Sequence, residues 1–185
     1  MHLLVRLHTH DDGSLGVASG WLTRQVEVGA TVQLRLRPHR RFRLEGNASR
    51  PLVLIGNGSG IAGLRGHLKA RALTGGGRNW LLFGERNAEH DSHYHEELAA
   101  WHRDGLLEQL DLVFSRDQAE RRYVQHRLAE RAALVQQWVA DGAAIYVCGS
   151  LDGMAAGVDA ALAAALGREA LDALAAAGRY RRDVY

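Results

Sequence analysis

The chain has 185 residues, 46% of them hydrophobic and 24% charged, and a formal charge of +2 at neutral pH. These values are typical of a folded globular protein and exclude a disordered chain, and arginines scattered among acidic residues argue against a nucleic-acid partner. One cysteine excludes an internal disulfide, no run reaches the roughly 18 apolar residues of a membrane span, and the first residues lack a signal-peptide pattern, so a cytoplasmic location is expected.

The first 50 residues predict part of an antiparallel β domain. In residues 1–10 and 31–42 apolar side chains alternate with polar ones, as Leu34 and Leu36 do with their neighbours. This alternation is typical of half-buried antiparallel strands. Between them, residues 16–29 predict a tight turn, a short helix and a second turn. We place the boundary to the next domain at residues 50/51.

After Pro51 the pattern predicts an α/β domain over residues 51–185. Apolar runs that fit buried parallel strands alternate with helical stretches. We expect a doubly wound, five-stranded parallel sheet, in which ligands bind at the carboxyl ends of the strands. The strand-like runs are residues 51–56, 79–85, 110–115 and 143–149, and the expected helices are 61–73, 92–104, 123–141, 151–166 and 168–177.

A glycine-rich turn follows the first of these strands. Residues 58–63 spell GxGxxG, between a predicted strand and a predicted helix. Glycines let the backbone turn tightly and approach a pyrophosphate, whose charge the start of the following helix attracts. The alternative is an ordinary strand-to-helix turn, because this spelling alone is weak evidence.

The third strand ends in a hydroxyl, two guanidinium groups, a phenol and an amide: Ser115, Arg116, Arg121, Tyr123 and Gln125. Guanidinium groups match phosphate geometry, so the first three residues could enclose the 2′-phosphate of NADP, with the phenol ring against adenine. One alternative is a solvated loop whose arginines make surface pairs. Another is an ordinary NAD dehydrogenase, in which Glu85 would bind the ribose hydroxyls.

Five ordered motifs together resemble the ferredoxin–NADP reductase superfamily, in its diflavin reductase branch typified by sulfite reductase flavoproteins. The resemblance covers the chain after Pro51 and extends back to the turn at residues 16–19. The motifs are GNGSGIAGLRGHLKAR (56–71), WLLFGERN (80–87), LDLVFSRDQAERRYVQHRL (110–128), IYVCGS (145–150) and RYRRDVY (179–185).

The resemblance implies an NADP site and part of an FAD site. It matches Gly56, Gly58, Ser59 and Gly60 to the turn beneath the NADP pyrophosphate, and Gly16, Val17, Ala18 and Ser19 to the turn that binds the FAD pyrophosphate. Cys148 matches a cysteine beside the nicotinamide, Asp183 a carboxylate that steadies positive charge there, and Tyr185 an aromatic that stacks on the flavin. Asn57 and Gly63 stand where the family usually has proline, which predicts a looser turn.

The implied reaction is hydride transfer from NADPH to FAD, with electrons passed to an acceptor such as an FMN domain or a hemoprotein. The family carries most of its flavin barrel before the segment that matches residues 16–19. Residues 1–50 are therefore expected to be the last part of that barrel. The alternative is a truncated, noncatalytic NADP-binding module. Unpaired strand edges would favour oligomers or a complementing chain.

A histidine-rich segment, residues 89–97, contains side chains that could bind a metal. A helix could place His93 and Glu97 on one face as ligands, near His90 and His95. A polar helix start capped by Asp91 or Ser92 explains the same residues. We expect no metal.

Overall fold

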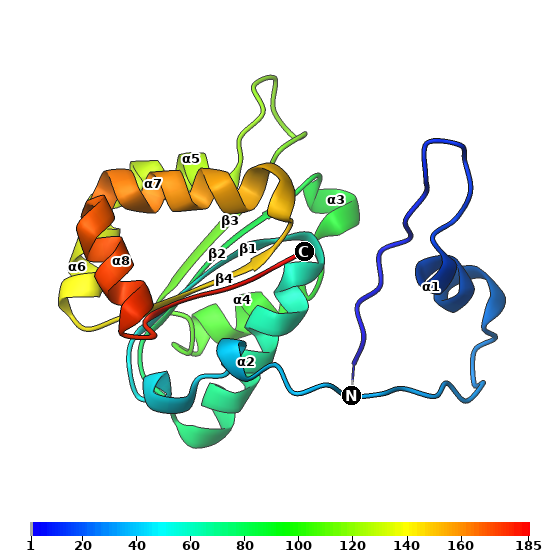
Figure 1. Ribbon diagram of the computed structural model, residues 1–185, viewed down its shortest axis with the longest axis horizontal. Coiled ribbons are helices and arrows are strands. Elements are labelled where there is room, and N and C mark those ends of the chain that lie inside the picture. The colour runs from blue at the N-terminus through cyan, green and yellow to red at the C-terminus, as the bar shows by residue number, and fades with distance from the viewer. Residues whose placement is uncertain (1) are drawn as a thin grey trace. The chain divides into compact units, whose positions relative to one another are not determined.

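The computed structural model describes residues 2–185, and it divides the chain into two compact units between His39 and Arg40 (Figure 1). The boundary expected at residues 50/51 falls inside the second unit. Residues 40–50 belong there because they bury Phe42 and Asn47 against it. The assignment of residues 1–50 to a flavin domain stays a prediction.

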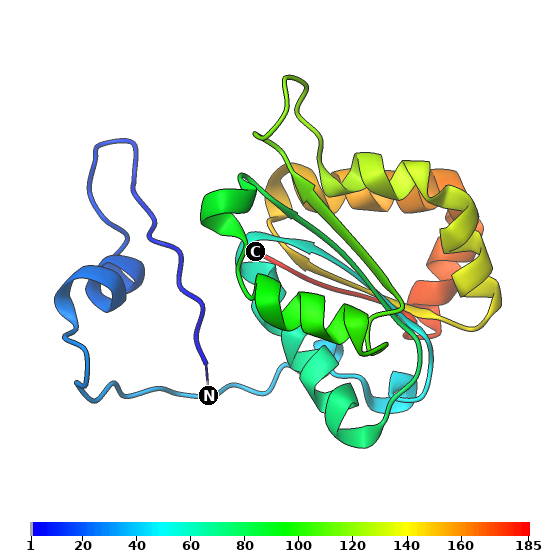
Figure 2. The same ribbon diagram turned by 180° about the vertical axis from the view of Figure 1, so that it is seen from behind.

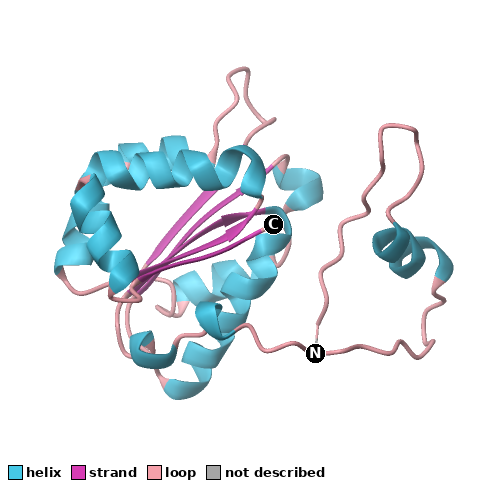
Figure 3. Cartoon of the chain, viewed as in Figure 1, coloured by secondary structure: helices cyan, strands magenta, loops and turns pink. Residues whose placement is uncertain are grey.

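In the first unit the expected short helix is present and the expected strands are not. The helix is α1 (Val17–Gly20), continued by a π-helical turn, η1 (Trp21–Gln25). Outside these two helical turns, residues 2–39 as described form loop, with one isolated bridge between Thr9 and Leu15 (Figure 3). The two predicted antiparallel strands are therefore wrong for residues 2–10 and 31–42, and Met1 lies outside the described residues. A strand needs a hydrogen-bonded neighbour, and without one Leu34 and Leu36 stay 50% and 76% exposed.

The second unit contains a five-stranded parallel sheet with the order β3-β2-β1-β4-β5, as expected from the sequence. The chain order reverses between β1 and β4, and this is where open α/β sheets bind ligands. Gly56 of β1 lies beside Cys148 of β4, which in turn lies beside Asp183 of β5. The strands are β1 (Leu52–Asn57), β2 (Asn79–Glu85), β3 (Gln109–Phe114), β4 (Ala144–Gly149) and β5 (Tyr180–Val184).

Helices cover both faces of this sheet (Figure 1), and the view from behind shows the same layers (Figure 2). Val53, Trp80 and Ile145 belong to the main apolar cluster, which α5 to α8 complete with Leu128, Val135, Leu162 and Leu171. On the other face, the Tyr146 ring of β4 meets His67 of α2. The helices are α2 (Ile61–Thr74), α3 (Ala88–Asp91), α4 (His95–Arg103), α5 (Val124–Glu130), α6 (Ala132–Ala140), α7 (Ala156–Leu166) and α8 (Arg168–Ala176).

Three expected helices are shorter or broken. Helix 92–104 begins only at His95, because Tyr94 adopts a left-handed backbone with φ of 61°. Helix 123–141 is interrupted at Arg131, whose guanidinium contacts the Asp111 carboxylate at 3.3 Å. Helix 151–166 starts with an irregular turn, η5 (Leu151–Ala155), in which Gly153 has a φ of 76°. No helix in residues 2–185 is long and apolar enough to cross a membrane.

Residues 40–50 are fastened to the sheet by aromatic and amide contacts. The rings of Phe42, His67 and Tyr146 pack together, with centroids 4.9 to 5.4 Å apart. The Asn47 side chain donates to the Tyr146 hydroxyl at 3.0 Å and to the Gly178 carbonyl at 2.8 Å. Burial lowers the pKa of His67 to about 4, so this ring is neutral in the folded protein at neutral pH. This segment therefore adds a small polar and aromatic cluster to the α2 face.

Candidate nucleotide-binding site

The glycine turn η4 (Gly58–Gly60) joins β1 to α2 at the reversal point of the sheet. Gly58 has a φ of 56°, which favours glycine. A Cβ on Gly60 would lie 2.1 Å from the Cys148 carbonyl oxygen, so this position admits only glycine. The turn is thus packed against the end of β4 and carries only the small Ser59 side chain toward the start of a 14-residue helix.

Cys148 is 2% exposed, on the face of β4 toward α2. A Cβ on Gly63 would lie 3.2 Å from its Sγ, so the absence of a side chain there makes room for the thiol. Burial raises the pKa of Cys148 to about 12, and the negative charge of Asp183 on the next strand adds to this. The group is therefore a neutral thiol at neutral pH and presents a small apolar surface.

Tyr185 follows β5 and is fixed at three points at the same edge of the sheet (Figure 1). Its N–H donates to the Gly149 carbonyl at 3.1 Å, and its own carbonyl accepts the N–H of Leu151 at 2.9 Å. Its hydroxyl forms a 2.9 Å hydrogen bond with the Ser59 hydroxyl. The structure therefore places seven of the predicted residues at one end of the sheet, and their binding roles stay predictions: Gly56, Gly58, Ser59, Gly60, Cys148, Asp183 and Tyr185.

The other predicted residues lie on the loop between β3 and α5, which projects from the sheet (Figure 3), except Gln125, which belongs to the first turn of α5. Backbone bonds from Ser115 to Glu85 and from Arg116 to Arg86, both 2.8 Å, hold its start beside the end of β2. Ser115 is buried, whereas the side chains of Arg116 and Arg121 are exposed and Tyr123 is 40% exposed. Gln125 turns toward α7, where its side chain lies within 3 Å of a Cβ built on Gly157.

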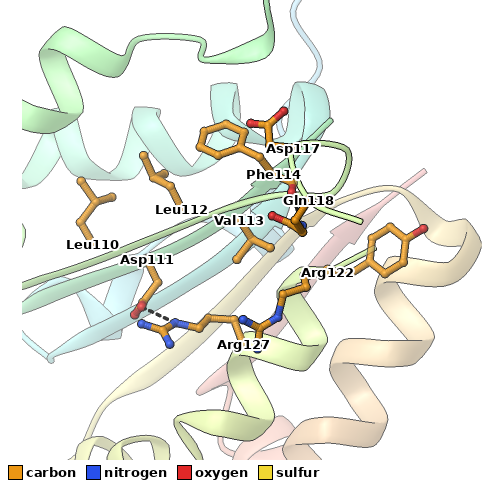
Figure 4. Close-up of a pocket in the computed structure, with 10 residues that line it drawn as sticks. Leu110, Asp111, Leu112, Val113, Phe114, Asp117, Gln118, Arg122 and Arg127 are labelled. Carbon is orange, nitrogen blue, oxygen red and sulfur yellow. Dashed lines mark hydrogen bonds and ion pairs between the residues drawn. The ribbon is translucent and has the colours of Figure 1, made fainter. Parts of the chain in front are cut away.

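A pocket of about 350 Å³ runs along β3 to this loop (Figure 4). Tyr123 lines it, together with Gln118 and Arg122, two residues that the sequence analysis did not select. Ser115, Arg116, Arg121 and Gln125 are not among its lining residues. Arg122 pairs with Glu130, and Gln118 donates to the Phe114 carbonyl at 2.6 Å. Tyr123, Arg116 and Arg121 thus lie on one loop, and of these three only Tyr123 lines the pocket.

Asp111, also missed, supports this end of the site. It is 5% exposed on β3 and accepts hydrogen bonds from Trp80 Nε1 at 2.9 Å and from Arg127 Nε at 2.7 Å. Arg127 belongs to α5, so the carboxylate ties to the sheet the helix whose start presents Tyr123 and Gln125. A polar residue inside an apolar run, LDLVF, was the available signal.

Glu85, the residue of the NAD alternative, is buried at the end of β2, with 7% of its surface exposed. Its Oε2 accepts the N–H of Arg86 at 3.3 Å. A carboxylate that is to receive ribose hydroxyls must be open to them, and Glu85 is less open than Arg116. The arginine loop therefore remains the better candidate for deciding between the two nucleotides.

The histidine-rich segment has a different organisation from a metal site. Glu97 pairs with Arg65 and with Lys69, and Tyr94 lies under the Arg65 guanidinium at 4.1 Å. Across residues 2–185, no group of three His, Cys, Asp or Glu side chains could hold a metal ion. Neither Asp91 nor Ser92 caps the helix, since Tyr94 precedes its first residue without a side-chain cap.

The turn expected to bind the FAD pyrophosphate, Gly16 to Ser19, forms the start of α1. The Ser19 hydroxyl accepts the N–H of His8 at 3.1 Å and lies 3.3 Å from the Gly16 carbonyl, to which it donates. Val17 and Ala18 are exposed. This hydroxyl is therefore engaged within its own unit, and the FAD-binding role of residues 16–19 stays a prediction. The residues of the second unit, in contrast, fit a phosphate-bearing nucleotide through their bare glycine turn and exposed arginines.

A family comparison matches residues 54–160 to the family described as "Oxidoreductase NAD-binding domain". This match covers more than half of the chain. The chain belongs to the oxidoreductase NAD-binding domain family. The predicted fold, the NADP-binding domain of ferredoxin reductase type, is confirmed.

Curated relatives of this NAD-binding domain include sulfite reductase (NADPH) flavoprotein alpha-components. That of Vibrio cholerae serotype O1 is 41% identical over 182 residues, covering 92% of this chain and 30% of that protein. That of Vibrio vulnificus is 38% identical over 199 residues, covering 100% of this chain and 32% of that protein. That of Mannheimia succiniciproducens is 38% identical over 193 residues, covering 98% and 32%. The resemblance to the diflavin branch is confirmed, and the chain spans about a third of the length of these relatives.

Proposed function

We propose that this chain is the NADP-binding module of a flavoprotein oxidoreductase and holds NADPH for hydride transfer to FAD. The observation that carries the proposal is the meeting of a glycine turn, a neutral buried thiol and Tyr185 at the reversal point of the sheet. The relatives' names, which include NADPH and flavoprotein, support it. An acceptor protein or domain, such as an FMN domain or a hemoprotein, would receive the electrons in the cytoplasm.

Each group in the proposed site has a physical role. Exposed Arg116 and Arg121 would bind the 2′-phosphate, so that the adenosine end supplies binding energy that aligns the distant ring. The turn at Gly58 to Gly60 would accept the pyrophosphate near the start of α2. NADPH supplies the hydride when bound, and FAD is its acceptor. Cys148 would exclude water beside the ring, and Asp183 would steady positive charge there.

A second candidate is a noncatalytic NADP-binding module that lacks a working flavin site. The observation that favours it is the first unit, where residues 2–39 form no strand and Ser19 is engaged internally. This candidate shares the nucleotide site of the first and differs only in the fate of the hydride.

Anaerobic mixing separates the two candidates. The purified chain is given FAD and then NADPH, and the absorption band of oxidised flavin is followed against FAD and NADPH without protein. Faster bleaching than in that control supports the reductase. Unchanged bleaching, with NADP⁺ binding intact by calorimetry, supports the binding module. A chain that binds no NADP⁺ contradicts both.

A further inference from the structure

Asn57, the last residue of β1, makes a side-chain contact that crosses to the end of β4. Its Oδ1 accepts the backbone N–H of Ser150 at 2.9 Å. The two strand ends are very close, because a Cβ on Gly149 would lie 2.2 Å from this Oδ1 and 2.7 Å from the Asn57 carbonyl oxygen. The amide is therefore wedged between the glycine turn and the segment that follows Cys148.

Ser150 depends on this contact. The pairing of β4 ends at Gly149, and the chain then enters the irregular turn η5. A backbone N–H at such a point needs an acceptor, since an unpaired, shielded donor is costly. Asn57 supplies the acceptor, so the segment after Cys148 is held by a side chain of the turn that precedes α2.

The same segment is held from its other side by Tyr185. Tyr185 bonds to Gly149 and Leu151 through its backbone and to Ser59 through its hydroxyl. The contacts thus form a closed ring: from the turn through Asn57 to Ser150, along the chain to Leu151, through Tyr185, and back to the turn at Ser59. Cys148 lies directly before this ring, with its carbonyl oxygen against Gly60.

We propose that Asn57 is a positioning residue that fixes the segment after Cys148 against the pyrophosphate turn. A nucleotide bound at the turn then meets the thiol edge in one geometry. This inference rests on the proposed function, because the nucleotide in question is NADP. The hydrogen bond from Ser150 to Asn57 also restrains the turn, although residue 57 is not the proline that is usual in the family.

The test uses the full chain and two readouts. The first is the rate at which iodoacetamide alkylates Cys148, measured by intact mass; the chain has one cysteine, so the signal is unambiguous. The second is the calorimetric affinity for NADP⁺ and for 2′,5′-ADP, which carries the adenosine end without the nicotinamide. Asn57→Ala removes the acceptor, and Asn57→Asp keeps it but adds a negative charge. Gln136→Ala is the control, because it removes an amide that bonds to the Ala165 carbonyl elsewhere.

We expect Asn57→Ala to alkylate about three- to tenfold faster and to bind NADP⁺ about three- to tenfold more weakly, the loss of one neutral hydrogen bond. Binding of 2′,5′-ADP should change little. Asn57→Asp should keep the slow alkylation of the wild type yet lose NADP⁺ affinity through charge repulsion. A purely structural role would not separate the two readouts in this way.

A second pair of variants keeps the test decisive if Asn57→Ala does not fold. Ser150 has a φ of −63°, which proline adopts; Ser150→Pro removes the N–H donor and turns the ring Cδ toward Asn57 Oδ1, so it breaks the contact from the other side. Ser150→Ala keeps that donor and is its control. Faster alkylation in Ser150→Pro than in Ser150→Ala supports the inference.

Equal alkylation rates in wild type, Asn57→Ala and Ser150→Pro without nucleotide overturn the inference, whatever the nucleotide results. Wild-type protein that binds no NADP⁺ overturns the proposed function and, with it, the positioning role. Wild-type binding of NADP⁺ with unchanged affinity in Asn57→Ala overturns the inference alone. The two failures are therefore distinguishable.

Discussion

The two ends of the proposed nucleotide site are built differently. The end that would hold the pyrophosphate and the nicotinamide is packed: the glycine turn touches the Cys148 carbonyl, and Tyr185 forms hydrogen bonds with Gly149, Leu151 and Ser59. The adenosine end is a projecting loop with exposed arginines. Hydride transfer requires a fixed distance between the reacting atoms, which suits a packed site. Affinity for the nucleotide can come from a loop that closes on the adenosine end, and the binding energy gained there aligns the distant nicotinamide ring. We therefore expect mutations at the packed end to act on folding and geometry, and mutations at the loop to act on affinity and selectivity.

The largest effect is expected for Gly60→Ala. Its Cβ would meet backbone atoms of Cys148 at 2.1 and 2.5 Å, and backbone atoms cannot rotate away. We expect a loss of about 3 kcal/mol in the free energy of unfolding, measured by urea denaturation. Gly66→Ala is the matched control in the same helix region, since nothing lies within 4 Å of its Cβ and stability should rise slightly. Equal effects of the two substitutions would contradict a packed turn.

Asp111→Ala tests what supports the open end. It leaves the buried Trp80 N–H and the two arginines, Arg127 and Arg131, without their shared acceptor. We expect destabilisation of about 2–3 kcal/mol, below the range for wholly buried pairs because both arginines are partly exposed. Glu130→Ala, which breaks only exposed pairs, should cost less than about 1 kcal/mol. Denaturation curves that do not separate these variants would exclude the support role of Asp111.

Arg116→Ala tests selectivity at the loop. Loss of one charge-assisted contact to the 2′-phosphate should weaken NADPH binding about ten- to a hundredfold and leave NADH binding nearly unchanged. Calorimetry with both nucleotides measures this, and Arg103→Ala, an exposed arginine of α4, is the control. An equal loss for NADH would show that Arg116 does not bind that phosphate.

The smallest effect concerns His67, at the packed side. Its pKa is about 4 in the folded protein, against about 6.5 in the unfolded chain. Burial is the main cause of the lower pKa; a hydrogen bond to the Phe42 backbone opposes it, and the positive charge of Arg181 lowers the pKa further. The unfolded chain therefore binds more protons as the pH falls below about 6.5, and stability falls from there toward pH 4. We expect His67 to contribute about 1.5–2 kcal/mol to the difference in stability between pH 7 and pH 5.

That contribution is measured as the difference between the wild type and His67→Phe, each unfolded by urea at the two pH values. The phenyl ring keeps the packing against Phe42 and Tyr146 and removes the titration. The same pH dependence in both proteins would show that another group causes it.

Sequence reasoning succeeded where local pattern and burial agree. The runs that became β1, β2 and β4 are mainly apolar and are buried, and the glycine turn was evident from its spacing after β1. The β3 run contains Asp111 and is only partly buried, with Leu112 exposed. Sequence reasoning failed for the segments 2–10 and 31–42, whose alternation describes a strand but cannot supply the neighbour that a strand needs.

Contacts between distant residues were the other limit. The break at Arg131 involves neither glycine nor proline, and it brings a guanidinium to Asp111, a residue 20 positions earlier. The bond between Asn57 and Ser150 spans 93 positions. Such pairs arise only when parallel strands bring their ends together, and no single stretch of sequence contains both partners.

Hydrogen exchange followed by mass spectrometry, with and without saturating NADP⁺, tests the central claim most directly. The account predicts slower exchange in two separate segments, residues 56–61 and 115–125, with the larger change in the second because it is open without ligand. Slowing in one segment alone, or in neither, would contradict a nucleotide that spans both ends of the sheet edge.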